Sequence, residues 1–302
     1  MRGWNVLPQS VEEVIEDIEA DHTSGASRIA SMGLQALEDL VKAAGPRLDA
    51  ATVQEAARRI ADAQRTNAAL YNVAQLFARL VSEGHDPKEV LVHLKEELET
   101  ARDHVARTFL KVAPDRGTVV TLTFSANVLA SLQLAASKGR IERVYVMEAR
   151  PVMEGRFLVV ALTEAGIPAT LVPDAMGPGL MAEATYALVG ADTILRDGSF
   201  VNKTGSYGLA LAAADYKKPL YVAAETLKFD ARHDLASWPG GPEMNPREVW
   251  PNPPERIDIR NRYFEAVPAR LVALYATERG TYAPDIVKTM LSQAGRTPRG
   301  ER

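Results

Sequence analysis

Apolar residues recur at helical spacing through the first third of the chain. Near its start they stand at Val11, Val14, Ile15 and Ile18, which places them on one face of a helix. Similar patterns, separated by Gly, Pro and Asp, continue to about residue 113. The predicted helices are one opened by Ser10 and Glu13 as a capping box, then 26–44, 53–63, 67–82 and 86–114. The sequence therefore predicts an all-helical domain over residues 1–114.

The pattern changes at Gly117, where β-branched runs begin to alternate with helical segments. The predicted strands are 118–124, 143–147, 168–172, 187–190 and 220–224, and the predicted helices between them are 127–137, 154–164 and 204–215. Such alternation is typical of a doubly wound parallel sheet with helices on both faces. The predicted fold class is therefore α/β, with the helical domain followed by a Rossmann-like domain over residues 115–302.

The C-terminal part of the sequence is less regular. Residues 226–254 are rich in Pro, Gly and Asn, and we expect them to form a long loop of the kind that is often functional. Residues 257–259 are predicted to be a last short strand, and residues 268–278 and 284–294 two terminal helices.

Polar residues gather where the predicted strands end. Asp192 follows one strand, Asn202 and Lys203 precede a helix, and Glu225 and Lys228 follow the next strand. Three of them have an ordinary explanation: Asp192 could cap a turn, Asn202 could cap the helix, and Lys203 could be solvated. Taken together they favour a ligand site, because open α/β sheets bind ligands at the carboxyl ends of their strands. An acid, an amide and two lysines suit a small anionic substrate.

Composition narrows the class of protein. The chain has 302 residues, of which 46% are hydrophobic and 25% charged, and its net charge is −4. It lacks the basic excess of a nucleic-acid-binding protein, an apolar run near the ~20 residues of a membrane span, and the apolar core of a signal peptide at its start. We therefore expect a cytoplasmic protein that binds neither nucleic acids nor membranes.

The sequence contains no cysteine, which excludes disulfides, thiolate metal ligands and a cysteine nucleophile. The histidines stand at 22, 85, 93, 104 and 233 without the spacing of metal ligands, so we expect no metal and no cofactor. His22 beside a helix start, and His233 in the long loop, are the two that could lie near a site.

Several short segments resemble one protein family. Residues 148–155 resemble an E-x-R-P-x-x-x-G segment, 190–192 with 202–207 resemble a G-A-D…N-K-x-G-x-Y signature, and 225–229 resemble E-T-x-K-F. Pieces within residues 260–280 match the family's last motifs imperfectly. These motifs, spread over nearly the whole chain, are similar to those of the initiation factor 2B alpha/beta/delta superfamily.

The resemblance implies sugar-phosphate chemistry. The superfamily holds methylthioribose-1-phosphate and ribose-1,5-bisphosphate isomerases, which convert a ring-closed aldose 1-phosphate to a ketose. It also holds regulatory initiation-factor subunits, some of which bind sugar phosphates without known catalysis. The E-T-x-K-F segment looks closer to the bisphosphate isomerase and factor branches. The expected partners are a small-molecule sugar phosphate and further copies of the chain, as a homodimer or higher homo-oligomer.

The resemblance also implies two catalytic positions. In the family's isomerases an aspartate and a cysteine serve as acid and base, and here they correspond to Asp192 and Ser125. A hydroxyl is far less acidic than a thiol, so Ser125 could act as a base only if another group activated it. The alternative is that Ser125 only caps the following helix.

The remaining carried-over positions would hold the substrate. Ser24 stands where the family has the arginine of an R-G-A phosphate segment, while Arg65 matches a second family arginine. Arg150 could contact ligand or form a buried ion pair with Glu148. The substrate-binding candidates are Ser24, Gly25, Ala26, Ser27, Arg65, Asn127, Arg150, Asn202, Lys203 and Lys228. The sequence thus favours an aldose–ketose isomerase acting on a ribose 1-phosphate, possible substrates including ribose 1,5-bisphosphate, with a non-catalytic sugar-phosphate sensor or factor-like regulatory subunit as the alternative.

Overall fold

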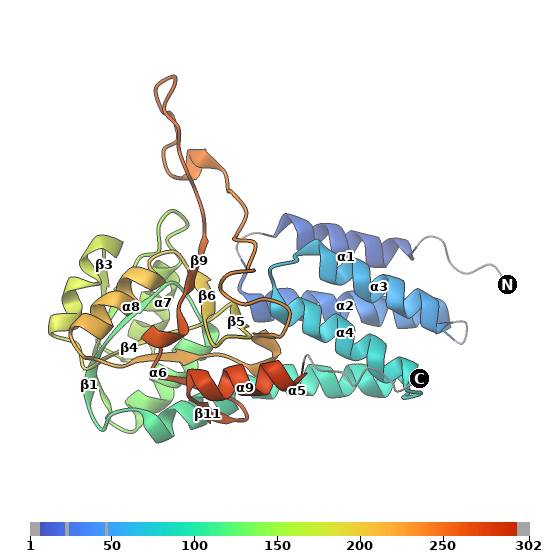
Figure 1. Ribbon diagram of the computed structural model, residues 1–302, viewed down its shortest axis with the longest axis horizontal. Helices are drawn as coiled ribbons and strands as arrows, with labels where there is room; N and C mark the ends of the chain where they lie inside the picture. Colours follow the sequence, from blue (N-terminus) through green and yellow to red (C-terminus); the bar gives the residue numbers. More distant parts are fainter. Residues whose placement is uncertain (1–6, 22–23, 46–47, 295–302) are drawn as a thin grey trace. The chain divides into compact units, whose positions relative to one another are not determined.

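Helices build the first of two units into which the chain divides, Met1–Ala101 and Arg102–Arg302 (Figure 1). The computed structural model describes residues 7–21, 24–45 and 48–294. The helices of the first unit are α1 (Gln9–Ala20), α2 (Ala26–Ala44), α3 (Ala50–Ala63), α4 (Ala68–Ser82) and the beginning of α5 (Pro87–Val112), which crosses the boundary between the units. Among the described residues of this unit there is no strand.

Side-chain caps explain where two of these helices begin. The carboxylate of Asp49 accepts a hydrogen bond from the amide of Thr52 at the start of α3, and Asn67 accepts one from Leu70 at the start of α4. The capping box predicted at Ser10 is wrong, because α1 begins at Gln9, directly after Pro8, and Ser10 lies inside its first turn. Proline supplies the fixed φ of a helix start, so no hydroxyl cap is needed there.

A largely parallel sheet forms the centre of the second unit. Its strand order is β11-β10-β7-β4-β1-β2-β3, and only β11 runs antiparallel to its neighbour. The strands are β1 (Gly117–Leu122), β2 (Ile141–Met147), β3 (Ala169–Val172), β4 (Tyr186–Val189), β7 (Leu220–Ala223), β10 (Leu274–Thr277) and β11 (Gly280–Tyr282).

Helices cover both faces of this sheet. The end of α5 packs on one face with α6 (Ala126–Ser137) and α7 (Gly155–Glu164), and α8 (Ser206–Asp215) and α9 (Pro284–Ala294) pack on the other. Alternate residues of β1 serve the two cores, since Val119 belongs to the first and Val120 to the second. The predicted doubly wound α/β class is confirmed.

A second, smaller sheet was not predicted. It has the order β8-β5-β6-β9, with β5 (Thr193–Leu195), β6 (Phe200–Lys203), β8 (Phe229–Asp230) and β9 (Phe264–Val267). The residues between Asp192 and Asn202 are therefore an antiparallel hairpin rather than a simple turn before a helix. Gly198, with φ of +82°, allows the chain to reverse there.

Two further predictions for the C-terminal part are wrong. No strand forms at residues 257–259, and residues 268–278 hold the short 3₁₀ helix η6 (Ala269–Leu271) and the strand β10 instead of a helix. Tyr275 is fully buried in the core of the sheet, and pairing of β10 with β7 outweighs local helix propensity.

The long loop predicted at 226–254 contains short elements. The 3₁₀ helices η4 (Thr226–Lys228) and η5 (Pro246–Glu248) lie in it, whereas η2 (Asp174–Met176) and η3 (Gly179–Ala182) precede β4. Figure 1 shows the segment between β8 and β9 as an extended arm, coloured orange. An isolated bridge joins Glu243 to Arg262 across it. None of the helices in the described ranges is long and apolar enough to cross a membrane.

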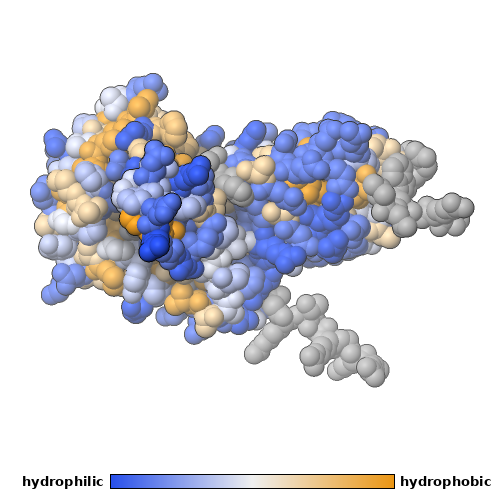
Figure 2. Space-filling view, turned by 90° about the horizontal axis from the view of Figure 1, so that it is seen from above, coloured by the Kyte–Doolittle hydropathy of each residue, from blue (hydrophilic) through white to orange (hydrophobic). Residues whose placement is uncertain are grey.

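Hydrophobic surface is distributed unequally over the two units. Figure 2 shows mostly hydrophilic residues on the visible face of the helical unit and several separate hydrophobic areas on the sheet unit. The exposed apolar side chains of the sheet unit include Phe157 and Val160 on α7, Met176, and Trp250 in the arm.

Close packing at the start of α7 gives a test of this fold. A Cβ at Gly155 would lie 2.2 Å from the carbonyl oxygen of Met147, whereas one at exposed Gly179 would meet nothing within 4 Å. Gly155→Ala should lower the free energy of unfolding by about 1–3 kcal/mol, because backbone must move. Urea unfolding monitored by circular dichroism measures this loss. Gly179→Ala is the control, and equal stability of the two variants would contradict the packing.

Candidate functional site

The carboxyl ends of the central parallel strands lie along one edge of the sheet, as the sequence predicted. Strained backbone marks this edge: Thr123 after β1 and Ala149 after β2 have φ of +59° and +61°, which side-chain-bearing residues rarely adopt. Such conformations persist only where surrounding contacts enforce them, and they concentrate at functional sites.

One buried cluster joins the ends of β1, β2 and β6. The ammonium nitrogen of Lys203 lies 3.0 Å from Oε1 of Glu154, and the hydroxyl of Thr123 donates to the other oxygen of this carboxylate. The Lys203 and Glu154 side chains are only 13% and 11% exposed. Lys203 also lies over the rings of Tyr263 and Phe264, at 5.0 and 4.8 Å from their centroids. Ion pairing and cation–π contacts together offset the cost of burying this ammonium group.

A second buried cluster surrounds Lys228. Its ammonium nitrogen lies 3.1 Å from Oε2 of Glu225, and the two side chains are 7% and 5% exposed. Burial alone would raise the pKa of Glu225, but the charge of Lys228 and hydrogen bonds, one of them from Asn127, lower it below its usual value. The amide oxygen of Asn127 is buried without a hydrogen-bond partner among the residues that the structure describes. A polar group of this kind calls for a water or a ligand atom.

Ser125 serves as the N-cap of α6. Its hydroxyl accepts from the amide of Val128 at 3.4 Å, which corresponds to the capping alternative that the sequence left open. The same hydroxyl lies against the end of β4, where a Cβ at Gly190 would come within 2.6 Å of it. The catalytic role of Ser125 stays a prediction, and its contacts within the described chain offer it no base.

The hairpin positions Asp192 and Asn202. The Asp192 amide donates to the carbonyl of Val201 at 2.9 Å, which aligns the end of β4 with β6. The side chain of Asn202 is buried and donates to the hydroxyl of Ser206 at 2.9 Å. The sequence placed both residues at one ligand site. The antiparallel pairing of β5 with β6 brings their backbones close together.

A carboxylate of the protein itself, that of Glu265, lies at the N-terminus of α8. Oε1 of Glu265 accepts from the amides of Gly205 and Tyr207 at 2.7 and 2.8 Å. A carboxylate is favourable at a helix N-terminus, where unpaired amides and the helix dipole attract negative charge. These two amides are therefore occupied by the protein itself, and sequence reasoning missed Glu265 because it lies far away along the chain.

Arg150 lies at the edge of the site and is exposed. Its guanidinium donates to the carbonyl of Val249 at 3.3 Å, while Asp174 accepts from the amides of Ala149 and Arg150 at 2.8 and 2.7 Å. The predicted buried ion pair between Arg150 and Glu148 is wrong, because Glu148 instead lies 3.6 Å from Arg156. Contact of Arg150 with a ligand stays a prediction.

The remaining predicted binding residues belong to the first unit. Ser24 donates its amide to Asp21 at 2.8 Å, Gly25 precedes the first residue of α2, and Ala26 is buried. Ser27 follows within the same turn of α2. The exposed Arg65 donates to Asp62 at 3.1 Å. His22 lies outside the described residues. Their part in a phosphate site stays a prediction.

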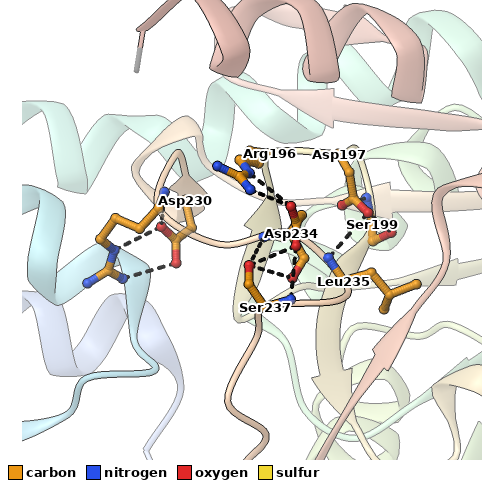
Figure 3. A network of polar contacts seen from close by, with 8 residues as sticks. Arg196, Asp197, Ser199, Asp230, Asp234, Leu235 and Ser237 are labelled. Carbon is orange, nitrogen blue, oxygen red and sulfur yellow. Dashed lines mark hydrogen bonds and ion pairs between the residues drawn. The ribbon is translucent and has the colours of Figure 1, made fainter. Parts of the chain in front are cut away.

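A network that the sequence did not reveal fixes the loop after β8 (Figure 3). Arg196 in the β5–β6 turn pairs with Asp234, and Asp197 accepts from the amide of Leu235 at 3.2 Å. Ser237 donates to Asp234 at 2.7 Å. The contacts of Arg196 and Asp197 link residues 38 positions apart, so neighbouring letters in the sequence give no signal of them.

Asp230, at the end of β8, is buried beside this network. It accepts from Nε of Arg232 at 2.8 Å and lies 2.8 Å from Nδ1 of His233. Burial alone would raise the pKa of Asp230, but these hydrogen bonds outweigh it and lower the pKa below its ordinary value. His233 therefore lies in the long loop as expected, and there it contacts this carboxylate. Within the described ranges no group of three or more His, Asp or Glu residues could hold a metal ion.

Comparisons with known proteins find the same superfamily that the sequence motifs indicated. A model described as the Initiation factor 2 subunit family matches residues 22–284. A “Ribose 1,5-bisphosphate isomerase” of Archaeoglobus fulgidus is 29% identical over 292 residues, covering 94% of this chain and 93% of the relative. A “5-deoxyribose 1-phosphate isomerase” of Moorella thermoacetica is 31% identical over 309 residues, covering 92% and 88%.

The solved structures include a similar fold. The crystal structure of the translation initiation factor eIF-2B of Pyrococcus horikoshii OT3 superposes with a TM-score of 0.79 and 28% identity, covering 92% of this chain and 98% of the other. Isomerases and an initiation factor are thus both similar to this chain over almost its whole length.

The buried carboxylate of Asp230 gives a pH test of the loop network. Because its folded-state pKa is lowered, its stabilisation is complete above the unfolded-state value of about 3.9 and is lost as pH falls toward the folded value. Asp230→Asn should cost about 2 kcal/mol at pH 7, and less as pH falls below about 4. Urea unfolding across this range measures the difference. Asp258→Asn, at an exposed position, is the control, and a pH-independent cost would refute the pairing.

Proposed function

Since the chain belongs to the Initiation factor 2 subunit family, we propose that it binds a sugar phosphate at the carboxyl edge of the sheet and isomerises an aldose 1-phosphate to a ketose. The observation that carries this proposal is the pair of buried ammonium groups, Lys203 and Lys228, near the ends of strands at that edge. Burying an ammonium group is costly even when it is paired. Two such groups beside strained strand ends suit an anionic ligand better than they suit a stabilising core.

The chemistry assigns a role to each side chain. A phosphate on the anomeric carbon prevents the ring from opening by itself, so an acid must protonate the ring oxygen and a base must assist hydrogen movement between C1 and C2. Asp192 is the proposed acid. Lys203 would hold the anomeric phosphate, and Oδ1 of Asn202 would accept a sugar hydroxyl. Lys228 would hold a second, distal phosphate.

The proposed substrate is a ribose 1-phosphate, with ribose 1,5-bisphosphate as the first candidate. Two relatives support this class by their names, one acting on a ribose bisphosphate and the other on a deoxyribose monophosphate. The buried amide oxygen of Asn127 beside Glu225 and Lys228 offers a further polar contact there. We also expect the chain to form a homodimer or higher homo-oligomer, which light scattering would test.

A binding protein without turnover is the second candidate. The N-cap role of Ser125 favours it, because the residue at the family's thiol position is used to start α6. The similarity to the Pyrococcus initiation factor points in the same direction. Phosphorus NMR with ribose 1,5-bisphosphate, ribose 1-phosphate and methylthioribose 1-phosphate separates the two functions. A ketose phosphate resonance would establish the isomerase, whereas line broadening without product would establish a binding protein.

Asp192→Asn should abolish turnover while it leaves most of the binding intact, because the amide keeps the shape of the side chain but cannot protonate the ring oxygen. We expect a fall of about 10²–10⁴-fold in kcat, measured by phosphorus NMR, with sugar-phosphate affinity measured by calorimetry. Asp197→Asn in the β5–β6 turn is the control. Full activity of Asp192→Asn would remove this residue from the mechanism.

Lys228→Gln should weaken the binding of ribose 1,5-bisphosphate more than the binding of ribose 1-phosphate, because only the bisphosphate carries a distal phosphate. Glutamine retains an N–H donor for Glu225, which limits the cost of leaving that buried carboxylate unpaired. Calorimetric titration of both ligands, with and without Lys228→Gln in the Asp192→Asn background that stops turnover, gives the two ratios of dissociation constants. Equal loss for both ligands would mean that Lys228 does not contact the distal phosphate.

A further inference from the structure

The proposed isomerisation needs a base, and Ser125 is engaged as a helix cap. Other carboxylates near this edge have structural partners. Glu225 is paired with Lys228, Glu265 holds two amides of α8, and Glu278 accepts both the amide and the hydroxyl of Thr226. Glu154 and Glu225 are each paired with a lysine proposed to bind phosphate, but only the partner of Glu154, Lys203, is proposed for the anomeric phosphate, beside the carbon atoms that react.

Contacts place Glu154 near the position of the family's thiol. Thr123, which donates to Glu154, stands two residues before Ser125 in the loop after β1. The hydroxyl of Ser125 lies against Gly190 at the end of β4. Glu154 is therefore connected to Ser125 through the short segment that follows β1.

A second set of contacts connects the segment of the proposed acid, Asp192, with Glu154. Asp192 stands two residues after Gly190, and its amide donates to Val201. Lys203, two residues after Val201, forms the ion pair with Glu154. Contacts at the ends of β4 and β6 thus connect the segment of Asp192 with Glu154.

We propose that Glu154 is the base of the isomerisation and that the substrate phosphate releases it by drawing Lys203 away. This inference rests on the proposed function. In this structure the Glu154 carboxylate is paired with the ammonium group that a phosphate would bind. Once Lys203 contacts the phosphate, Oε1 of Glu154 is no longer engaged by the ammonium group and is available to accept a proton from carbon. Binding of the substrate phosphate therefore frees the Glu154 carboxylate to act as the base.

The reaction then balances without another reactant. Glu154 removes the proton from C2, the electron pair forms the C1–C2 double bond, and the bond from C1 to the ring oxygen breaks as that oxygen takes the proton of Asp192. In the second half Glu154 returns its proton to C1 while the hydroxyl on C2 loses its proton to Asp192. The product is the ketose phosphate, and both carboxyl groups recover their initial states.

The test compares the effects of Glu154→Gln on turnover and on binding. Glutamine can still accept from Thr123 but cannot take a proton, and it does not neutralise Lys203. We expect kcat for ribose 1-phosphate, followed by phosphorus NMR, to fall about 10²–10⁴-fold. Affinity for ribose 1-phosphate should stay equal or rise. Calorimetry measures it with Asp192→Asn and with the double variant Asp192→Asn/Glu154→Gln, in which no turnover disturbs the titration.

Two further variants separate chemistry from structure. Glu154→Asp keeps a carboxylate and should retain more turnover than Glu154→Gln. This holds even though the aspartate side chain is one methylene shorter, whereas glutamine has nearly the volume of glutamate. Glu148→Gln, in the same segment between β2 and α7 and paired with Arg156, should leave turnover within a few-fold. Thermal unfolding by circular dichroism confirms that each variant folds.

Unchanged turnover in Glu154→Gln would overturn the base role, and so would loss of binding in parallel with turnover, since that pattern marks a positioning residue for Lys203. If the unaltered protein binds ribose 1-phosphate but gives no ketose, the isomerase itself fails, and the role of Glu154 in turnover fails with it. If the unaltered protein gives ketose and only Glu154→Gln departs from expectation, the proposed function stands and this inference alone falls.

Discussion

A buried ammonium group needs a carboxylate beside it, and this constraint organises the carboxyl edge of the sheet. Lys203 and Lys228 are both nearly inaccessible, and each lies about 3 Å from a carboxylate oxygen. Removing one partner of such a pair costs about 3–5 kcal/mol. The first pair also connects three strand ends, because Thr123 donates to the carboxylate of Glu154 that Lys203 contacts. The interactions that hold the strand ends together are therefore the ones that a phosphate would rearrange.

In this arrangement proton transfer does not require a thiol at position 125. Ser125 caps α6 and packs against Gly190, so a small residue there keeps the ends of β1 and β4 in contact. Proton transfer can then rest with two carboxyl groups, Asp192 and Glu154. A binding protein would use the same lysines without the proton transfers.

Local signals predicted the main elements well, and non-local contacts account for what they missed. The bounds of α2 follow from apolar spacing that ends at Gly45. The strand at 274–277 was predicted as a helix because its apolar residues suit both periods, and only its pairing with β7 decides the matter. The hairpin at 193–203 has strands of three and four residues, too short for a periodic pattern. Among site residues, motif letters identified Lys203 and Lys228, but their partners emerge only from the folded chain.

A crystal structure of the protein with ribose 1-phosphate bound tests the central claim most directly. The account predicts phosphate density beside the ammonium nitrogen of Lys203, with that nitrogen moved out of contact with Glu154. The sugar ring should lie between Glu154 and Asp192. A ligand bound elsewhere on the protein, with the Lys203–Glu154 pair intact at its present 3.0 Å, would contradict it.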